Sequence, residues 1–276
     1  MPELPEVETI RRALEPVLAG RSFERVEILD TRLVRPLEPL EVAAELEGER
    51  VAAVERRGKY LVFRFESGRV LLVHLRMTGG FRHGAAVASP ADDPYVRAVV
   101  KLDDGSDVAY RDIRRFGTWL VIERDEVDTY LASKVGVEPL ERAFTAKALA
   151  ERLARRRAPL KSAILDQRVA AGVGNIYADE ALWRARLHPL REARTLDHEE
   201  TAELRVAIRK ALQLGIRRQG ASLRDYASLR GERGGMQHEF KVYGRDGEPC
   251  DRCGTEIVKT RVGGRGTWFC PECQRR

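Results

Sequence analysis

The amino terminus combines residue types that suit covalent chemistry. The chain opens MPELPEVET, so Pro2 follows Met1 directly, and Glu3 and Glu6 come soon after. A small second residue normally permits removal of Met1, which would leave Pro2 with a free secondary amine. We expect its pKa to lie below the roughly 7.7–8.0 of a generic terminus, because the start of the following helix favours the free base. Such an amine can attack C1′ of a sugar to form a cationic iminium, and Glu3 and Glu6 can move protons. The alternative is an ordinary helix start, with glutamates beside the helix dipole.

All four cysteines belong to a second pattern, in which two Cys-x2-Cys pairs are separated by sixteen residues: Cys250, Cys253, Cys270 and Cys273. The segment between the pairs alternates like a β-hairpin that turns at Gly263-Gly264. Two disulfides are the alternative, but nothing indicates export. Four thiolates close a tetrahedral site and leave no open position for a substrate, so the pattern predicts one structural zinc ion.

A third candidate site is the glycine-rich start of a helix. Residues 172–175 read GVGN before an amphipathic stretch, and we expect Asn175 to cap that helix. The glycines allow a ligand to approach the first amides, and Lys161 on the preceding helix adds a positive charge. The pattern predicts a phosphate-binding turn, with a plain helix–turn–helix connection as the alternative.

Two different sets of elements must position these residues. The first half begins with a helix, in which Val7, Ile10, Leu14 and Val17 recur at helical spacing. It continues with strands that indicate an antiparallel sandwich or barrel: 24–30, 51–56, 59–66, 69–76, 97–103, 107–111 and 118–123. The second half is helical over 144–155, 159–167, 175–185 and 197–218, and residues 219–238 form a loop rich in Gly, Arg and Ser. We therefore expect an α+β protein with a β-sandwich domain (1–135), a linker (136–143), a helical domain (144–235) and a zinc hairpin (236–276).

The composition and the opening residues argue against a membrane-spanning or secreted protein. Of the 276 residues, 43% are hydrophobic and 33% charged, and apolar runs are far shorter than the ~20 residues of a membrane helix. The acidic opening is unlike a secretory signal. We expect a soluble, cytoplasmic protein that acts as a monomer. Residues 1–143 carry a net charge of −4, residues 144–235 a net charge of +8 and residues 236–276 a net charge of +2. This asymmetry favours a polyanionic partner, although a solvated basic helical surface is an equal alternative.

Six segments spread over the whole chain together resemble the bacterial formamidopyrimidine-DNA glycosylase family: MPELPEVET (1–9), RRGKYL (56–61), HLRMTG (74–79), RDIRRFG (111–117), GVGNIYADEAL (172–182) and GGRGTWFCPECQ (263–274). The resemblance implies a helix–two-turns–helix motif in the helical domain. It also implies a base-excision repair enzyme that removes oxidised purines, such as 8-oxoguanine and formamidopyrimidines, and then cuts the strand by β,δ-elimination. Pro2 matches the nucleophile of the family, Glu3 its catalytic acid, and Glu6 a further acid.

The resemblance also assigns DNA contacts. The matches to residues that hold phosphates around the lesion are Lys59, His74, Asn175, Arg265 and, more weakly, Tyr243. Lys59 and Arg265 are counted with the catalytic residues. Because Arg265 lies at the tip of the zinc hairpin, zinc would order a DNA-contacting loop.

Three further positions, Met77, Arg114 and Phe116, match a trio that enters the DNA stack when the damaged nucleotide leaves it. Core packing is the alternative for Met77 and Phe116. Ser222, Arg224 and Tyr226 fall in the segment that matches a lesion-capping loop. Thr78 stands where some relatives have a glutamate that touches the base.

Two other functions remain open from the sequence. One is an endonuclease VIII-like enzyme for oxidised pyrimidines, although that group usually has Gly where this chain has Leu4. The other is a non-catalytic binder of damaged DNA, which has no need of a free amine at Pro2. In each case the partner is double-stranded DNA containing oxidised bases or abasic sites.

Overall fold

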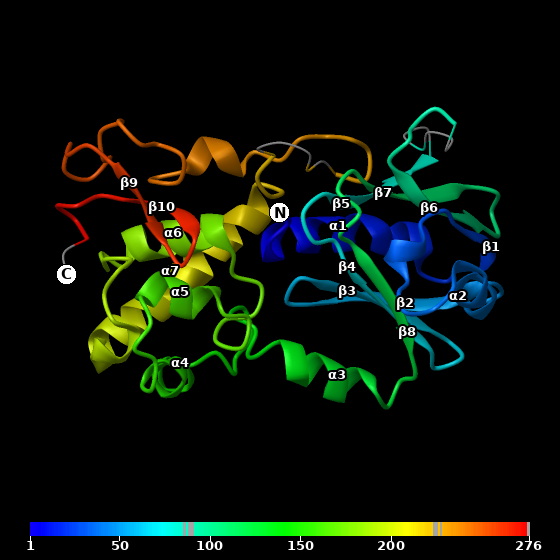
Figure 1. The fold of residues 1–276 in the computed structure, drawn as a ribbon, viewed down its shortest axis with the longest axis horizontal. Helices are drawn as coiled ribbons and strands as arrows, with labels where there is room; N and C mark the ends of the chain where they lie inside the picture. The colour runs from blue at the N-terminus through cyan, green and yellow to red at the C-terminus, as the bar shows by residue number, and fades with distance from the viewer. Residues whose placement is uncertain (85–86, 88–90, 223–225, 227, 275–276) are drawn as a thin grey trace. The chain divides into compact units, whose positions relative to one another are not determined.

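The computed structural model describes residues 1–84, 87, 91–222, 226 and 228–274. The chain forms two compact units (Figure 1). Unit 1 comprises Met1–Ser133 and Arg218–Gly235, and unit 2 comprises Lys134–Arg217 and Met236–Arg276. This division differs from the expected boundaries, because the segment 218–235 belongs to the unit of the sandwich and not to the helical part. The segment hydrogen-bonds to unit 1 at two places: Ala221 N donates to Glu6 of the amino-terminal helix, and the carbonyls of Ser228 and Leu229 accept from Arg82 and His83.

Unit 1 is an antiparallel β-sandwich with a helix against it. Helix α1 spans Leu4–Leu18 and buries Leu4, Val7, Ile10, Leu14 and Leu18. One sheet has the order β1-β6-β7-β5, formed by Phe23–Ile28, Val96–Leu102, Asp107–Asp112 and Gly79–His83. The other has the order β2-β3-β4-β8, formed by Val51–Arg57, Tyr60–Phe65, Val70–His74 and Thr118–Ile122. The expected α+β class and sandwich are confirmed.

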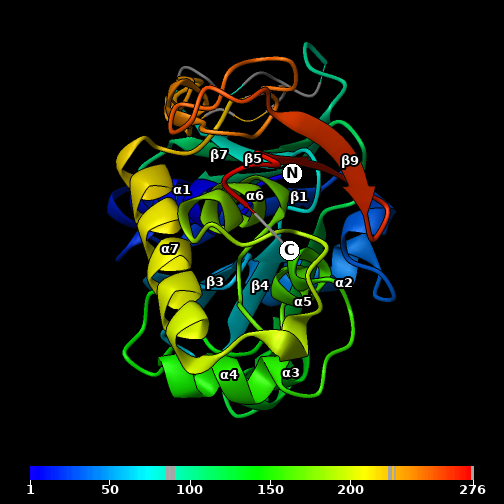
Figure 2. The same ribbon diagram turned by 90° about the vertical axis from the view of Figure 1, so that its left-hand side faces the viewer.

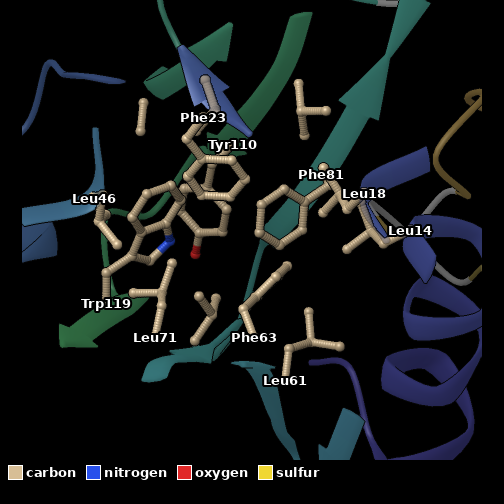
Figure 3. Packing of buried hydrophobic residues seen from close by; sticks show 14 of the residues in the cluster. Leu14, Leu18, Phe23, Leu46, Leu61, Phe63, Leu71, Phe81, Tyr110 and Trp119 are labelled. Atoms are coloured by element: carbon tan, nitrogen blue, oxygen red, sulfur yellow. The ribbon is translucent and has the colours of Figure 1, made fainter. Parts of the chain in front are cut away.

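The core of unit 1 lies between the two sheets and α1 (Figure 3). Phe63 and Trp119 come from one sheet and Phe81 and Tyr110 from the other, and Leu14 of α1 joins the same cluster. Four elements of unit 1 were not predicted from the sequence: strand β5, helix α2 (Pro39–Leu46), the short 3-10 helix η1 (Thr31–Leu33) and helix α3 (Val127–Lys134).

Unit 2 contains four helices among its described residues: α4 (Ala146–Leu153), α5 (Leu160–Leu165), α6 (Asn175–Arg184) and α7 (His198–Arg217). Helices α6 and α7 lie side by side, and Figure 2 shows the length of α7. Two short 3-10 segments, η3 (Ala193–Thr195) and η4 (Met236–Glu239), flank α7 in the sequence. Strands β9 (Val258–Val262) and β10 (Arg265–Phe269) form the expected hairpin. No helix in the described part of the chain has the length and apolar character needed to cross a membrane.

Candidate functional site

The amino-terminal residues are held by a buried capping arrangement at the start of α1. Glu3 is the N-cap residue, and Glu3 and Glu6 form a capping box in which Glu6 Oε2 accepts from Glu3 N at 2.8 Å. Both glutamates are 2% exposed, and Pro2 is also buried. The fold therefore brings Pro2, Glu3 and Glu6 together, as the sequence analysis expected.

Glu6 also ties the segment 218–235 to the amino terminus. Its Oε1 accepts from Ala221 N at 2.8 Å, so one side chain joins the backbone of Glu3 to that of a residue 215 positions after Glu6. Gly220 has φ +78°, and a Cβ there would lie 2.7 Å from Glu6 Cγ. A glycine is needed here both for its backbone conformation and for the close approach.

Ser222 is buried within the same segment. Its hydroxyl donates to the carbonyl of Tyr226 at 2.8 Å and accepts from Gly234 N at 2.9 Å. In this structure Ser222 shapes the loop and is 2% exposed. Its predicted contact with a lesion remains a prediction, and Arg224 lies outside the described residues.

Lys59 and His74 lie close together in the β2-β3-β4 sheet. Gly58 and Lys59 form a two-residue turn between Arg57 and Tyr60, and Tyr60 pairs with His74. Burial, with the charges of Arg76 and Lys59 as further causes, lowers the pKa of His74 to about 3, so the imidazole is neutral. Its Nδ1 accepts from Arg76 N at 3.0 Å, which leaves the proton on Nε2 as a donor suited to a phosphate oxygen.

The turn that bears Lys59 is linked to α1 through Glu8. Glu8 is 8% exposed, and Arg56 Nε donates to it at 3.0 Å. Arg56 Nη1 donates in turn to the carbonyl of Gly58 at 3.0 Å. Despite the cost of burial, hydrogen bonds and charges from arginines lower the pKa of Glu8. A chain of polar contacts therefore fixes the Lys59 turn relative to the helix that begins beside Pro2.

The residues matched to the intercalating trio lie on two neighbouring segments, which we call the wedge segments: residues 75–78 after β4 and residues 113–117 after β7. Phe116 is 51% exposed, which excludes the alternative of a sandwich-core aromatic. The guanidinium carbon of Arg114 lies 4.7 Å from the centroid of the Phe116 ring. Met77 is half-buried. Unit 1 therefore presents an aromatic ring stacked with an arginine on its surface.

In unit 2 the expected roles of Asn175 and Lys161 need correction. Gly174, not Asn175, is the N-cap of α6, and Asn175 Nδ2 donates to the carbonyl of Gly266 at 3.0 Å. Lys161 is 0% exposed, and its ammonium donates to Gly266 O and to Thr267 Oγ1, both at 2.8 Å.

The Lys161 ammonium also forms an ion pair with Asp179 at 2.7 Å. Burial raises the pKa of Asp179 to about 7, against the opposing charge of Lys161. A lysine so placed holds the β9-β10 hairpin on α6, and in this structure it is not exposed to a phosphate.

Arg265 and Tyr243 lie around this anchored hairpin. Arg265 is exposed and directly precedes Gly266, whose carbonyl accepts from both Lys161 and Asn175. The Tyr243 ring lies 4.5 Å from that of Trp268, centroid to centroid.

A second buried carboxylate of α6 holds the backbone beside Tyr243. Oε1 of Glu180 accepts from the backbone N–H groups of Lys241, Val242 and Tyr243 at 2.8, 3.0 and 3.2 Å. Helix α6 thus positions both the hairpin and residues 241–243.

The four cysteine sulfurs all lie within 4.8 Å of one another. Cys253 and Cys270 are 3.5 Å apart at sulfur, near the ~3.8 Å expected around a tetrahedral zinc and far from the ~2.05 Å of a disulfide. Trp183 Nε1 of α6 donates to Cys250 Sγ at 3.3 Å. The donor set fits one structural zinc ion, and the prediction of zinc over disulfides is confirmed.

The residues that hold the site residues in place were not predicted from the sequence. Glu8, Asp112, Asp179 and Glu180 are buried carboxylates with partners distant in the sequence. Each lies inside a motif that the analysis quoted or next to one. A carboxylate surrounded by apolar residues, as in GNIYADEAL, is the signal that could have indicated burial with a fixed partner.

Models of known protein families match three consecutive parts of the chain. The formamidopyrimidine-DNA glycosylase N-terminal domain matches residues 1–119, and the formamidopyrimidine-DNA glycosylase H2TH domain matches residues 135–227. A zinc finger found in FPG and IleRS matches residues 247–276.

Similar proteins cover the chain from end to end. Formamidopyrimidine-DNA glycosylases of Geobacillus kaustophilus and Roseiflexus are 44% and 45% identical, each over 100% of both chains. Among solved structures, a mutant of Lactococcus lactis FPG in complex with DNA containing Fapy-dG matches with a TM-score of 0.93 at 39% identity over 100% of both chains. A complex of Lactococcus lactis Fpg with abasic-site DNA has a TM-score of 0.92 at 39% identity and covers 99% of this chain and 100% of that one. The chain is a member of the formamidopyrimidine-DNA glycosylase family.

Proposed function

We propose that the protein is a DNA glycosylase and abasic-site lyase that removes oxidised purines from double-stranded DNA during base-excision repair. The observation that carries this proposal is the burial of Pro2 beside two glutamates at the start of α1, in a chain whose relatives are glycosylases along their full length. A relative's structure with Fapy-dG in its DNA supports the oxidised-purine substrate.

The chemistry follows from these residues once Met1 is removed. The Pro2 nitrogen attacks C1′ and gives up its proton, while the bond from C1′ to the base breaks and Glu3 supplies a proton to the departing base. The C1′–O4′ bond then breaks as O4′ takes up a proton, which opens the sugar ring and forms the C=N bond of an iminium. The resulting iminium acidifies the proton at C2′. Its loss expels the 3′ phosphate, and a further elimination releases the 5′ phosphate. Glu6 holds the backbone N–H of Glu3 and thereby positions the catalytic pair.

DNA binding is assigned to groups in both units. Lys59 and neutral His74 of unit 1, and Asn175, Tyr243 and Arg265 of unit 2, are proposed phosphate contacts. We assign Lys161 to the support of Arg265 and not to DNA. The proposed domain division follows the two units, with one chain acting as a monomer. A cytoplasmic location, with the enzyme working on nucleoid DNA, accords with that substrate.

The decisive experiment is borohydride trapping on a duplex with 8-oxoguanine opposite cytosine. Wild-type protein with Met1 removed should form a covalent adduct with the DNA, because borohydride reduces the iminium. Pro2→Gly should lose the adduct at Pro2, and Glu3→Gln should keep DNA binding but lose base removal. If wild type gives no adduct here but gives one on a bare abasic site, a different lesion is the substrate.

An endonuclease VIII-like preference is the second candidate. One observation keeps it open: a Lactococcus lactis FPG complex with DNA containing an oxidised pyrimidine matches with a TM-score of 0.91 at 39% identity. Excision rates from 8-oxoguanine:C and thymine-glycol:A duplexes, measured side by side, distinguish the two. We expect the faster rate on 8-oxoguanine.

A further inference from the structure

One buried carboxylate contacts both wedge segments. Asp112, the last residue of β7, is 1% exposed. Its Oδ2 accepts from the backbone N–H groups of Phe116 at 3.0 Å and Gly117 at 2.7 Å. Its Oδ1 accepts from Arg114 N at 3.2 Å and from the hydroxyl of Thr78. All four donors are satisfied by a single charged side chain, and hydrogen bonds to a charged acceptor are the stronger kind.

Thr78 makes the connection between the segments. Its hydroxyl donates to Asp112, and its oxygen accepts from Arg114 N at 2.9 Å. Because Thr78 directly follows Met77, this hydroxyl joins the backbone beside Met77 to the backbone of the segment that bears Phe116. The same hydroxyl is therefore engaged in the protein and is not directed at a DNA base in this structure.

The second wedge segment is also anchored to the body of the sandwich. Arg115 has φ +59°, in the left-handed region that non-glycine residues rarely adopt, and its guanidinium donates to both oxygens of Asp30 at 2.5 and 2.7 Å. Asp30 is 3% exposed. Arg115, Arg114 and Phe116 are all exposed, but of these three side chains Arg115 is the one held by the ion pair with Asp30.

Two glycines permit close packing under both segments. A Cβ on Gly79 would lie 2.2 Å from the Tyr110 hydroxyl oxygen, and a Cβ on Gly117 would lie 1.8 Å from the same atom. The residues after Thr78 and after Phe116 therefore rest on one buried side chain. Movement of one segment away from the other would break contacts with Asp112 and with Tyr110 together.

We propose that Thr78 and Asp112 join the two wedge segments into one rigid unit, so that side chains from both enter the DNA stack in a single step. The inference rests on the proposed function, and on the expectation from the family resemblance that Met77, Arg114 and Phe116 enter the DNA stack when the damaged nucleotide leaves it. Thr78 and Asp112 are positioning residues. A unit whose two parts are already fixed loses less conformational freedom on binding than two independent loops do.

The test follows insertion without catalysis. Duplex DNA carries a tetrahydrofuran abasic analogue, which cannot form an iminium, and 2-aminopurine beside it, whose fluorescence rises on unstacking. In stopped-flow mixing, wild type should give one rise. Thr78→Val should slow that rise about tenfold or divide it into two phases, because it removes both the hydrogen bond donated to Asp112 and the one accepted from Arg114 N. Thr78→Ser keeps the hydroxyl and should restore the single rise.

A double-mutant cycle separates coupling from general damage. In a Met77→Ala background the first wedge segment has lost the side chain whose entry Thr78 would couple to that of Phe116. Thr78→Val should therefore add no further slowing of the fluorescence rise. Thr201→Val is the matched control, because its buried hydroxyl donates to Asp197 O at 2.7 Å in unit 2.

Three results would overturn the proposal. The fluorescence rise of Thr78→Val could match that of wild type, Thr78→Val could slow the rise as much in the Met77→Ala background as in wild type, or Thr78→Ser could fail to restore the single rise. No rise with wild type would also overturn it. A single rise together with no base removal from any oxidised-base duplex would reject the proposed function and leave the coupling intact.

Discussion

His74 shows how a buried side chain can be suited to an anion without carrying charge. Its pKa, lowered to about 3 chiefly by burial, lies below the ~6.5 of an exposed histidine. The unfolded chain therefore binds a proton at pH values where the native protein does not. Stability contributed in this way is present above about pH 6.5 and is lost as pH falls towards 3, by about 1.4 kcal/mol per pH unit.

We predict that the free energy of unfolding of His74→Gln falls less steeply than that of wild type between pH 6.5 and 4.5. Urea titrations at pH 6.5, 5.5 and 4.5 measure the two slopes. His238→Gln, which removes an exposed histidine of unit 2, controls for the loss of an imidazole. Parallel slopes for wild type and His74→Gln would show that His74 is not held neutral.

Glu6 carries a prediction of its own. Glu3 N and Ala221 N both donate to the Glu6 carboxylate at 2.8 Å. A glutamine has one acceptor oxygen, so Glu6→Gln must leave one of these two N–H groups without its acceptor. We expect a loss of about 1–3 kcal/mol in stability, the usual cost of an unsatisfied buried donor. Trypsin should also cut faster after Arg218 or Arg233. An unchanged cleavage rate would mean that Glu6 does not hold this segment.

At the scale of elements, the Lys161–Asp179 pair predicts how the zinc hairpin depends on α6. Lys161→Met leaves a buried carboxylate without its ion-pair partner, which costs about 3–5 kcal/mol. DNA affinity should fall as Arg265 loses its support. In an Arg265→Ala background, however, Lys161→Met should leave the slope of log affinity against log salt unchanged. A further drop of about 0.9 in that slope would restore Lys161 as a direct phosphate contact.

The elements themselves were predictable where side chains alternate or recur. Strand β6 alternates between buried and more exposed side chains, and helices α4 and α7 bury residues at helical spacing, whereas strand β4 was recognisable as a short apolar run. Strand β5 begins with Gly79 and Gly80, which show no alternation because they have no side chains. The segment 218–235 joins unit 1 through contacts such as Glu6 to Ala221, and no local pattern in the sequence records a partner 215 residues away.

At the scale of the whole molecule, Pro2 and Glu3 lie in unit 1 and the zinc ligands lie in unit 2. Removing zinc therefore tests whether the two units fold independently. Each unit has its own buried core, and Trp183 of α6 donates to Cys250. Removing zinc leaves four thiolates without their ligand bonds, so residues 250–273 should lose their fold together with the hairpin. Unit 1, with Pro2 and Glu3, contains none of the metal ligands.

We predict that chelation lowers one calorimetric unfolding transition, that of unit 2, and leaves a second transition near its original temperature. On DNA, the zinc-free protein should bind more weakly, with a salt slope lower by about 0.9 because Arg265 is no longer held at a phosphate. Adding zinc should restore both. The basic charge of residues 144–235 (net +8) should sustain residual, salt-sensitive binding, since it lies outside the zinc hairpin. If chelation lowers both transitions equally, the units do not unfold independently; if the salt slope is unchanged, Arg265 is not a phosphate contact and the hairpin serves stability alone.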